Sequence, residues 1–346
     1  MRYGLDKDLG KEFNMSKRES VKKRALMAIL LAGGMLSSGP GAFSAPKAGA
    51  VSKNQLELVN KIVGNQNISS ELRAYFLIQI ARSALQGVDG GALEKQYGPY
   101  AAAGAFNLFS RRRSAFNSSL SAMASQLSLE ANSTKEDKPG EKRGNSALAE
   151  TALKEALPLL ETSDNSFARL NLYFMASYLF RKTGNEIESK YCQKKVDDAI
   201  KGCESDFSHH ANHIEGVVAV LNSMAYGYVP VQISDWQRPS AAGAGKQTKS
   251  YAKKNIAEAE KLKLRALALA DRLDSGSQLR RKAHRDMVLW YQELGKSDAA
   301  RNEKEILFNL VGVHDDKILY PQSFGCGSLV WWKVEPLVSR FSCGMG

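Results

Sequence analysis

The chain has 346 residues, of which 43% are hydrophobic and 24% charged, and its formal net charge is +12. This composition supports a large buried core, which excludes wholesale disorder, a collagen-like chain and a disulfide-dense miniprotein. No apolar run reaches the roughly 18 residues of a membrane-spanning helix, which excludes a multi-span membrane protein. The length predicts about two domains.

Residues 1–45 predict a signal peptide. A basic segment at 15–24 precedes an apolar stretch at 25–36, and small residues with a proline follow at 39–45. This order is typical of export signals, and the apolar stretch is too short to span a bilayer of ~30 Å comfortably. We therefore expect an exported protein, periplasmic, cell-envelope or secreted, with Met15 as an alternative start. An uncleaved anchor is the alternative.

The chain stays basic without this segment. Residues 1–45 hold 8 basic and 4 acidic residues, so 40 basic and 32 acidic residues remain, a net charge of +8. Positive charge attracts anionic polymers over long distances. In an exported protein, this leaves an anionic envelope polymer as an alternative partner and argues against nucleic acid.

Apolar residues at helical spacing predict an N-terminal helical block over residues 46–130. Ser52 and Gln55 form a capping-box pattern before a helix that ends near Gly64. A second helix runs through 72–84 to a stop near Gly87, and a third carries apolar residues over 116–127. Residues 131–145 are dense in charge, proline and glycine and predict a flexible linker.

Residues 146–312 predict helices in antiparallel pairs. The first and third pairs have very short turns, at Gly184-Asn185 and Gly295-Lys296, which forces their helices into contact. The middle pair has a long connection at 228–249, of the kind often used for binding. The predicted pairs are 165–183 with 187–204, 209–226 with 250–273, and 277–294 with 297–311.

The pairs resemble the tetratricopeptide repeat family, in which a helix pair closes on small residues and a tight glycine turn. The segment 291–295 (YQELG) looks like the end of the family's first helix, and 298–300 (DAA) with Leu307 looks like the start of its second. Small residues elsewhere match less well, and the family's first-helix Trp and closing Pro are absent from the matched positions. These weaker matches are Ala259 with Ala266, and Tyr173, Ser177, Phe180, Gly184, Ser189 and Val196.

The resemblance predicts an all-α, helical-hairpin solenoid over roughly residues 165–311. It implies a protein or peptide partner on a concave face. We expect no cofactor. Tyr173, Phe174 and Tyr178 are candidate partner-binding residues for such a face, with burial in the core as the alternative.

Histidines cluster at 209–213 (HHANH), followed by Glu215. On a helix, His209 and His213 would share a face and form a candidate metal site. His210 occupies the position of the Glu in the zinc-protease H-E-x-x-H motif, so the usual general base is missing. A solvent-facing helix start is the competing interpretation.

The tail, residues 313–346, predicts a cap closed by a disulfide. Cys326 and Cys343 are 17 positions apart and flanked by glycines, so in an oxidising compartment they can pair, which contributes about 3 kcal/mol. Trp331 and Trp332 lie in this loop and either cap the last hairpin or bind a partner.

The other two cysteines, Cys192 and Cys203, lie on one predicted helix about 16 Å apart along its axis, too far to pair with each other. They are buried thiols or pair elsewhere.

No phosphate loop, dinucleotide fingerprint or nucleophile elbow occurs in the sequence. The leading hypothesis is therefore an exported, non-catalytic helical repeat protein that binds a protein or peptide. A cell-envelope enzyme acting on polysaccharide and a polyanion-binding structural module are the alternatives.

Overall fold

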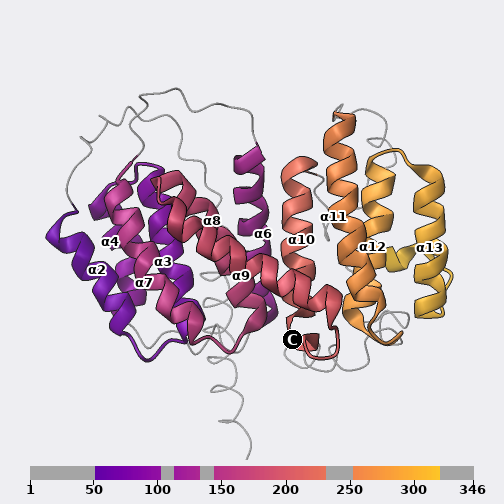
Figure 1. The fold of residues 1–346 in the computed structure, drawn as a ribbon, viewed down its shortest axis with the longest axis horizontal. Coiled ribbons are helices and arrows are strands. Elements are labelled where there is room, and N and C mark those ends of the chain that lie inside the picture. Colours follow the sequence, from indigo (N-terminus) through magenta and orange to yellow (C-terminus); the bar gives the residue numbers. More distant parts are fainter. Residues whose placement is uncertain (1–50, 103–112, 133–143, 231–251, 320–346) are drawn as a thin grey trace, which may run out of the picture. The chain divides into compact units, whose positions relative to one another are not determined.

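The described part of the chain is built from helices. The computed structural model describes residues 51–102, 113–132, 144–230 and 252–319, and these residues form no strand (Figure 1). The all-α prediction is confirmed for them. The predicted signal peptide, most of the predicted linker, and the tail residues Cys326, Trp331, Trp332 and Cys343 lie outside the described residues.

The N-terminal helices are α2 (Lys53–Gly64), α3 (Ser70–Leu85), α4 (Gly90–Ala102) and α6 (Arg113–Asn132). The capping box of α2 is confirmed, because the Ser52 hydroxyl accepts from the Gln55 amide and the Gln55 side chain accepts from the Ser52 amide. Helix α4 was not predicted, since it contains the helix breakers Gly90, Gly91 and Pro99.

Three consecutive helices begin with the same cap. An asparagine precedes each of α7 (Ser146–Glu161), α8 (Ser166–Thr183) and α9 (Glu186–Ser205), and its side-chain oxygen accepts from a backbone amide of the first turn. These bonds satisfy amides that have no partner within the helix. The boundaries of the three helices are therefore fixed by local sequence.

The predicted pairs form hairpins. Helix α8 packs on α9, α10 (Ile214–Tyr228) packs on α11 (Lys253–Asp271), and α12 (Gln278–Glu293) packs on α13 (Ser297–Val311). Short 3-10 helices precede α10 (Ala211–His213) and follow α13 (Asp316–Leu319). The turns after α8 and α12 use Gly184 and Gly295 at φ of 86° and 71°, in the left-handed region that favours glycine.

The small residues predicted at helix contacts lie at such contacts. Ala259, Ala266 and Ala300 are all buried. In the first hairpin, the Ser189 hydroxyl donates to the carbonyl of Ser177 at 2.8 Å, which joins α9 to α8. Small side chains let the helix backbones come close together at these positions.

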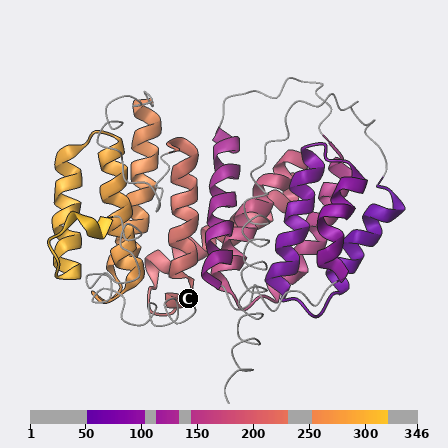
Figure 2. The same ribbon diagram turned by 180° about the vertical axis from the view of Figure 1, so that it is seen from behind.

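A regular solenoid is not confirmed. Helix α6 lies against both α8 and α10, so an N-terminal helix is packed among the helices of the predicted repeats (Figure 2). Helix α3 likewise packs on α7 and α8. One hydrophobic cluster runs from α2 to α11, and helices on either side of the predicted linker share it. The predicted domain boundaries stay predictions.

The contact between α6 and α10 includes small polar residues. The Ser125 hydroxyl donates to the Ser223 hydroxyl at 3.2 Å, and the Ser223 hydroxyl donates to the carbonyl of Ser121 at 3.4 Å. One turn further along α10, a Cβ on Gly227 would lie 2.3 Å from the Oγ of Ser128 and 2.7 Å from its carbonyl oxygen. Only glycine fits at that position without a shift of α6.

This close approach predicts that Gly227→Ala destabilises the protein. Overpacking costs about 1–3 kcal/mol, which exceeds the gain of up to ~1 kcal/mol in helix propensity. Urea denaturation would measure the free energy of unfolding. Gly64→Ala is the matched control, because Gly64 is also helical and a Cβ added to it would meet no atom within 4 Å. Equal stabilities of the two variants would contradict the contact.

The cysteines of α9 are free thiols. Cys192 and Cys203 are buried on one continuous helix and form no disulfide. Burial raises the pKa of the Cys192 thiol to about 12 and that of Cys203 to about 11. Both side chains are therefore protonated and unreactive at neutral pH.

We predict that alkylation of the unfolded, unreduced mature protein modifies Cys192 and Cys203 and leaves Cys326 linked to Cys343. Peptide mapping by mass spectrometry would identify the modified residues. Alkylation of all four cysteines would show that the predicted tail disulfide is wrong.

Candidate partner-binding surface

The candidate metal ligands lie outside the helix on which their pairing depends. Helix α10 begins at Ile214, so His209 lies in a turn and His213 in a 3-10 helix. His209 is exposed and contacts Asp206, with 2.7 Å between Nδ1 and Oδ2. The pKa of His213 is lowered, mainly by burial and secondly by the positive charge of the nearby Arg169. No group of three or more metal-ligating side chains was found among the described residues.

The candidate partner-binding aromatics of α8 are buried. Tyr173, Phe174 and Tyr178 all belong to the main hydrophobic cluster, so the structure favours the core alternative for them. Helices α3, α6, α7, α9 and α10 all pack against α8 and leave these rings little exposed surface.

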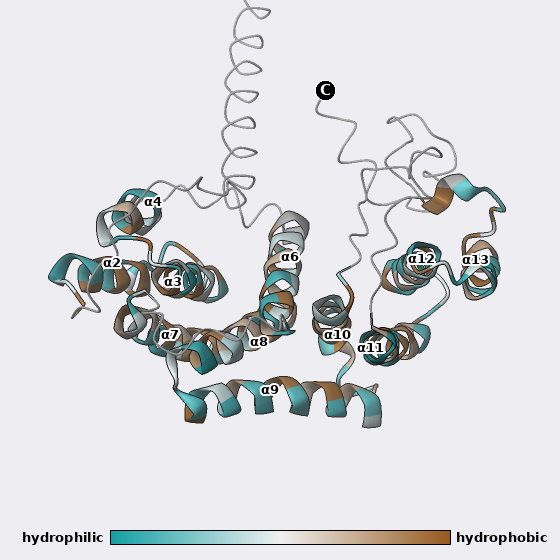
Figure 3. Cartoon of the chain, turned by 90° about the horizontal axis from the view of Figure 1, so that it is seen from above, coloured by the Kyte–Doolittle hydropathy of each residue, from teal (hydrophilic) through white to brown (hydrophobic). Residues whose placement is uncertain are grey.

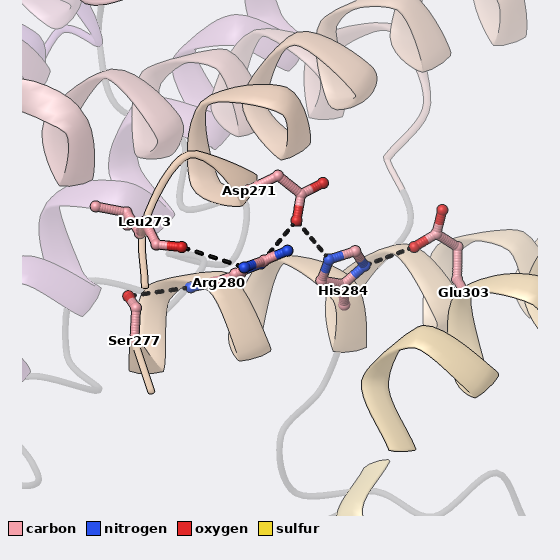
Figure 4. Close-up of polar contacts among 6 residues, drawn as sticks. All are labelled: Asp271, Leu273, Ser277, Arg280, His284 and Glu303. Carbon is pink, nitrogen blue, oxygen red and sulfur yellow. Dashed lines mark hydrogen bonds and ion pairs between the residues drawn. The ribbon is translucent and has the colours of Figure 1, made fainter. Parts of the chain in front are cut away.

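A buried histidine joins the last three helices. His284 of α12 is only 2% exposed, and its two ring nitrogens contact carboxylates on different helices (Figure 4). Nε2 lies 2.8 Å from Asp271 of α11, and Nδ1 lies 2.7 Å from Glu303 of α13. Arg280 donates to the same oxygen of Asp271 at 2.9 Å and to the carbonyl of Leu273.

This arrangement links α11, α12 and α13 and is not a metal site. The two carboxylates flank the ring of His284 on different sides, so the three groups do not converge on one metal ion. Both ring nitrogens are engaged and the ring is buried, which leaves no nitrogen to act as a base on a substrate. Burial lowers the pKa of His284, but the hydrogen bonds that its charged ring donates to Glu303 and Asp271 outweigh burial, so the pKa is raised overall.

The raised pKa predicts a pH-dependent contribution to stability. The charged ring stabilises the fold fully below the unfolded pKa of about 6.5, and this contribution is lost as pH rises through the higher folded pKa. Below pH 6, His284→Gln should cost about 3 kcal/mol, because it leaves two carboxylates without their shared cation. The difference in the free energy of unfolding between this variant and the natural chain should shrink towards pH 8, as measured by urea denaturation at each pH.

His314→Gln is the control for this series. His314 is exposed after α13 and its ring packs edge-on against Phe308, so its replacement should cost about 1 kcal/mol or less at every pH. If the stability cost of His284→Gln is the same at pH 5.5 and at pH 8, a charged His284 does not hold the two carboxylates.

A second polar cluster lies at the surface, around the last residue of α7. Glu161 ends α7, and the antiparallel hairpin α8–α9 brings three side chains to its carboxylate. The Tyr173 hydroxyl donates to Oε1 at 2.7 Å, the Tyr191 hydroxyl donates to the same oxygen, and Lys195 Nζ lies 3.1 Å from it. Tyr191 and Lys195 are one turn apart on α9, and the ammonium lies 5.2 Å from the Tyr191 ring centroid.

The hydrogen bonds of this cluster keep Glu161 ionised. The hydrogen bond from Tyr191, and to a smaller extent the one from Tyr173, lowers the pKa of Glu161 to about 2. The bond to Glu161 in turn raises the pKa of Tyr191, so its hydroxyl remains a donor. A glycosidase needs two carboxyl groups, one of which gives up a proton, whereas Glu161 is paired with two phenols and an amine. The cluster orders a surface tyrosine.

The outward side of α9 carries exposed residues that we call the α9 ridge. It comprises Ile187, Lys190, Tyr191, Lys194, Asp198 and Lys201. Ile187 is 81% exposed and Tyr191 39%, and they are one turn apart. Figure 3 shows α9 packed on one side only, with no other described helix beyond it. This is the candidate site.

Sequence reasoning missed the α9 ridge, although a signal was present. The buried residues of α9 form one stripe at helical spacing, comprising Ser189, Cys192, Val196, Ile200 and Cys203. Ile187 and Tyr191 fall outside that stripe, and apolar residues outside the buried stripe of an amphipathic helix indicate an exposed patch. The role of Glu161 depends on helix packing and has no local sequence signal.

Comparison of the chain with protein-family models, curated proteins and solved structures gives no match. The tetratricopeptide-like resemblance therefore depends on the residues quoted for it. No helix in the described part of the chain is both long and apolar enough to cross a membrane.

Proposed function

We propose that this chain is an exported, non-catalytic helical protein that binds another protein or a peptide through the α9 ridge. The observation that carries the proposal is Ile187, a large apolar side chain left 81% exposed one turn from an ordered tyrosine. Exposed apolar side chains beside aromatic ones are typical of binding surfaces.

The ridge is ordered before any partner binds. Glu161 fixes the Tyr191 hydroxyl, so a partner would lose little side-chain entropy by packing on that ring. The start of α9 is capped by Asn185, and Arg272 of α11 donates to the carbonyls of Cys203 and Glu204 at its end. A helix held at both ends presents its side chains in fixed positions.

Export is part of the proposal and is supported by the basic and apolar segments before residue 45. The tetratricopeptide-like hairpins support a binding role by analogy alone, because fold does not determine function. An enzyme acting on polysaccharide has weaker support, since the carboxylates of Glu161, Asp271 and Glu303 already form hydrogen bonds within the chain.

Affinity capture tests the proposal. The immobilised mature protein, residues 46–346, is incubated with the envelope fraction of its own cells, and retained proteins are identified by mass spectrometry. We expect Ile187→Glu to weaken retention of a specific partner at least about tenfold, because a central apolar anchor contributes more than ~1.4 kcal/mol. Glutamate suits the first turn of a helix, so α9 itself should remain intact.

Leu264→Glu is the matched control. Leu264 is also an exposed large apolar residue on a helix, but it lies on α11 and outside the ridge. A partner that is lost equally from both variants, or from neither, would contradict binding through the α9 ridge.

A further inference from the structure

A lysine of α11 is buried without a partner. Lys263 is 8% exposed and is the one charged residue among the buried residues of that helix. Within the described part of the chain its amine forms no ion pair and no hydrogen bond. Ala259 and Leu267 stand one turn away on either side and belong to a hydrophobic cluster. Burial lowers the pKa of Lys263, because the charged form loses its hydration.

The described acids around the buried lysine are engaged with other cations. Asp286 of α12 attracts the amine, but it pairs with Arg285 at 3.2 Å and lies one turn from the exposed Lys282. Glu260, one turn earlier on α11, contacts the ammonium of Lys296 at 2.6 Å. A buried ammonium without a counter-ion is strongly destabilising, so one further carboxylate at this position would stabilise the fold.

A second buried donor on α12 also lacks a partner. Trp290 is 1% exposed, and its Nε1 has no hydrogen-bond acceptor. Trp290 belongs to the same hydrophobic cluster as Ala259 and Leu267, the residues that flank Lys263 on α11. Buried polar groups in proteins are nearly always hydrogen-bonded. Donors without acceptors on both helices therefore indicate that a segment carrying acceptors covers the contact between α11 and α12.

The chain leaves the described residues beside these helices. Ile318 and Leu319, at the end of the last described segment, are buried in one cluster with Val288 of α12. Residues 320–346 follow, and they combine many apolar side chains with a single acid, Glu335. The 16 positions from Leu319 to Glu335 can span up to about 50 Å, roughly twice the ~24 Å length of α12. Glu335 can therefore reach α11 across α12.

We propose that the segment around Glu335 packs over the contact between α11 and α12 and that its carboxylate pairs with Lys263. The apolar residues on both sides of it, 329–332 and 336–338, cover the same contact, and a backbone carbonyl accepts from Trp290 Nε1. The charge selects this segment, because the buried amine lacks a carboxylate and the segment offers one. The inference is independent of the α9 ridge and assigns the tryptophans of the tail to the chain's own surface.

A double-mutant cycle tests the pair, with thermal unfolding of the mature protein followed by circular dichroism. Glu335→Gln should lower the melting temperature by at least about 4 °C, because it leaves the ammonium of Lys263 buried without a counter-ion. In a chain that also carries Lys263→Met, the same change should shift the melting temperature by less than about 1 °C, since no charge remains to be paired.

Two control variants assign the coupling to this pair. Lys254→Met replaces an exposed lysine of the same helix and should leave the effect of Glu335→Gln unchanged. Asp235→Asn removes the one acid of residues 231–251, which precede α11, and should show no coupling to Lys263→Met.

Every other outcome overturns the inference. If Glu335→Gln lowers the melting temperature equally with and without Lys263, the glutamate acts elsewhere. If Asp235 is the acid coupled to Lys263, a different segment covers the contact. If Glu335→Gln leaves the melting temperature of the natural chain unchanged, the buried amine has no partner in the tail. None of these results bears on binding through the α9 ridge.

Discussion

The fold depends on the close approach of α6 and α10. Helix α6 comes from the N-terminal part of the sequence and α10 from the middle. They meet at serines, whose hydroxyls form hydrogen bonds across the contact, and at Gly227, where the two helices come too close for a Cβ. Helix α6 also contributes Leu120 and Leu127 to the hydrophobic cluster that includes residues of α3, α7 and α8. The contact therefore joins the N-terminal helices to the hairpins and explains why the described helices do not form a simple row of stacked hairpins.

Local sequence signals predicted most helix boundaries. The Ser52 capping box, the glycine turns at 184 and 295 and the apolar stripes each reflect interactions within a few residues, so they are visible in the sequence. Two errors have physical causes. Gly90 and Pro99 hid α4, because tertiary contacts with α2 and α3 override poor helix propensity. The histidine segment 209–213 was predicted as helical, whereas α10 begins only at Ile214.

The candidate site could not be predicted, because it depends on which surfaces the packing leaves uncovered. The aromatics of α8 have the spacing of a binding face, yet α6 and its neighbours cover that helix. Because α8 is covered, the exposed apolar surface of this hairpin lies on α9, at Ile187 and Tyr191. Ser121 and Ser125 carry no local sequence signal of a buried contact, although they form hydrogen bonds between α6 and α10. The function proposed for α9 is thus a consequence of where α6 packs.

Cysteine cross-linking tests the position of α6 most directly. The hydroxyls of Ser125 and Ser223 lie 3.2 Å apart, so Ser125→Cys with Ser223→Cys should form a disulfide under mild oxidation, detected as linked peptides by mass spectrometry. Ser118→Cys with Ser223→Cys, which places the first cysteine about two turns away on α6, should form little of it. An efficient link in the first pair alone is the predicted result. No link in the first pair, or equal links in both, would contradict the packing of α6 on α10.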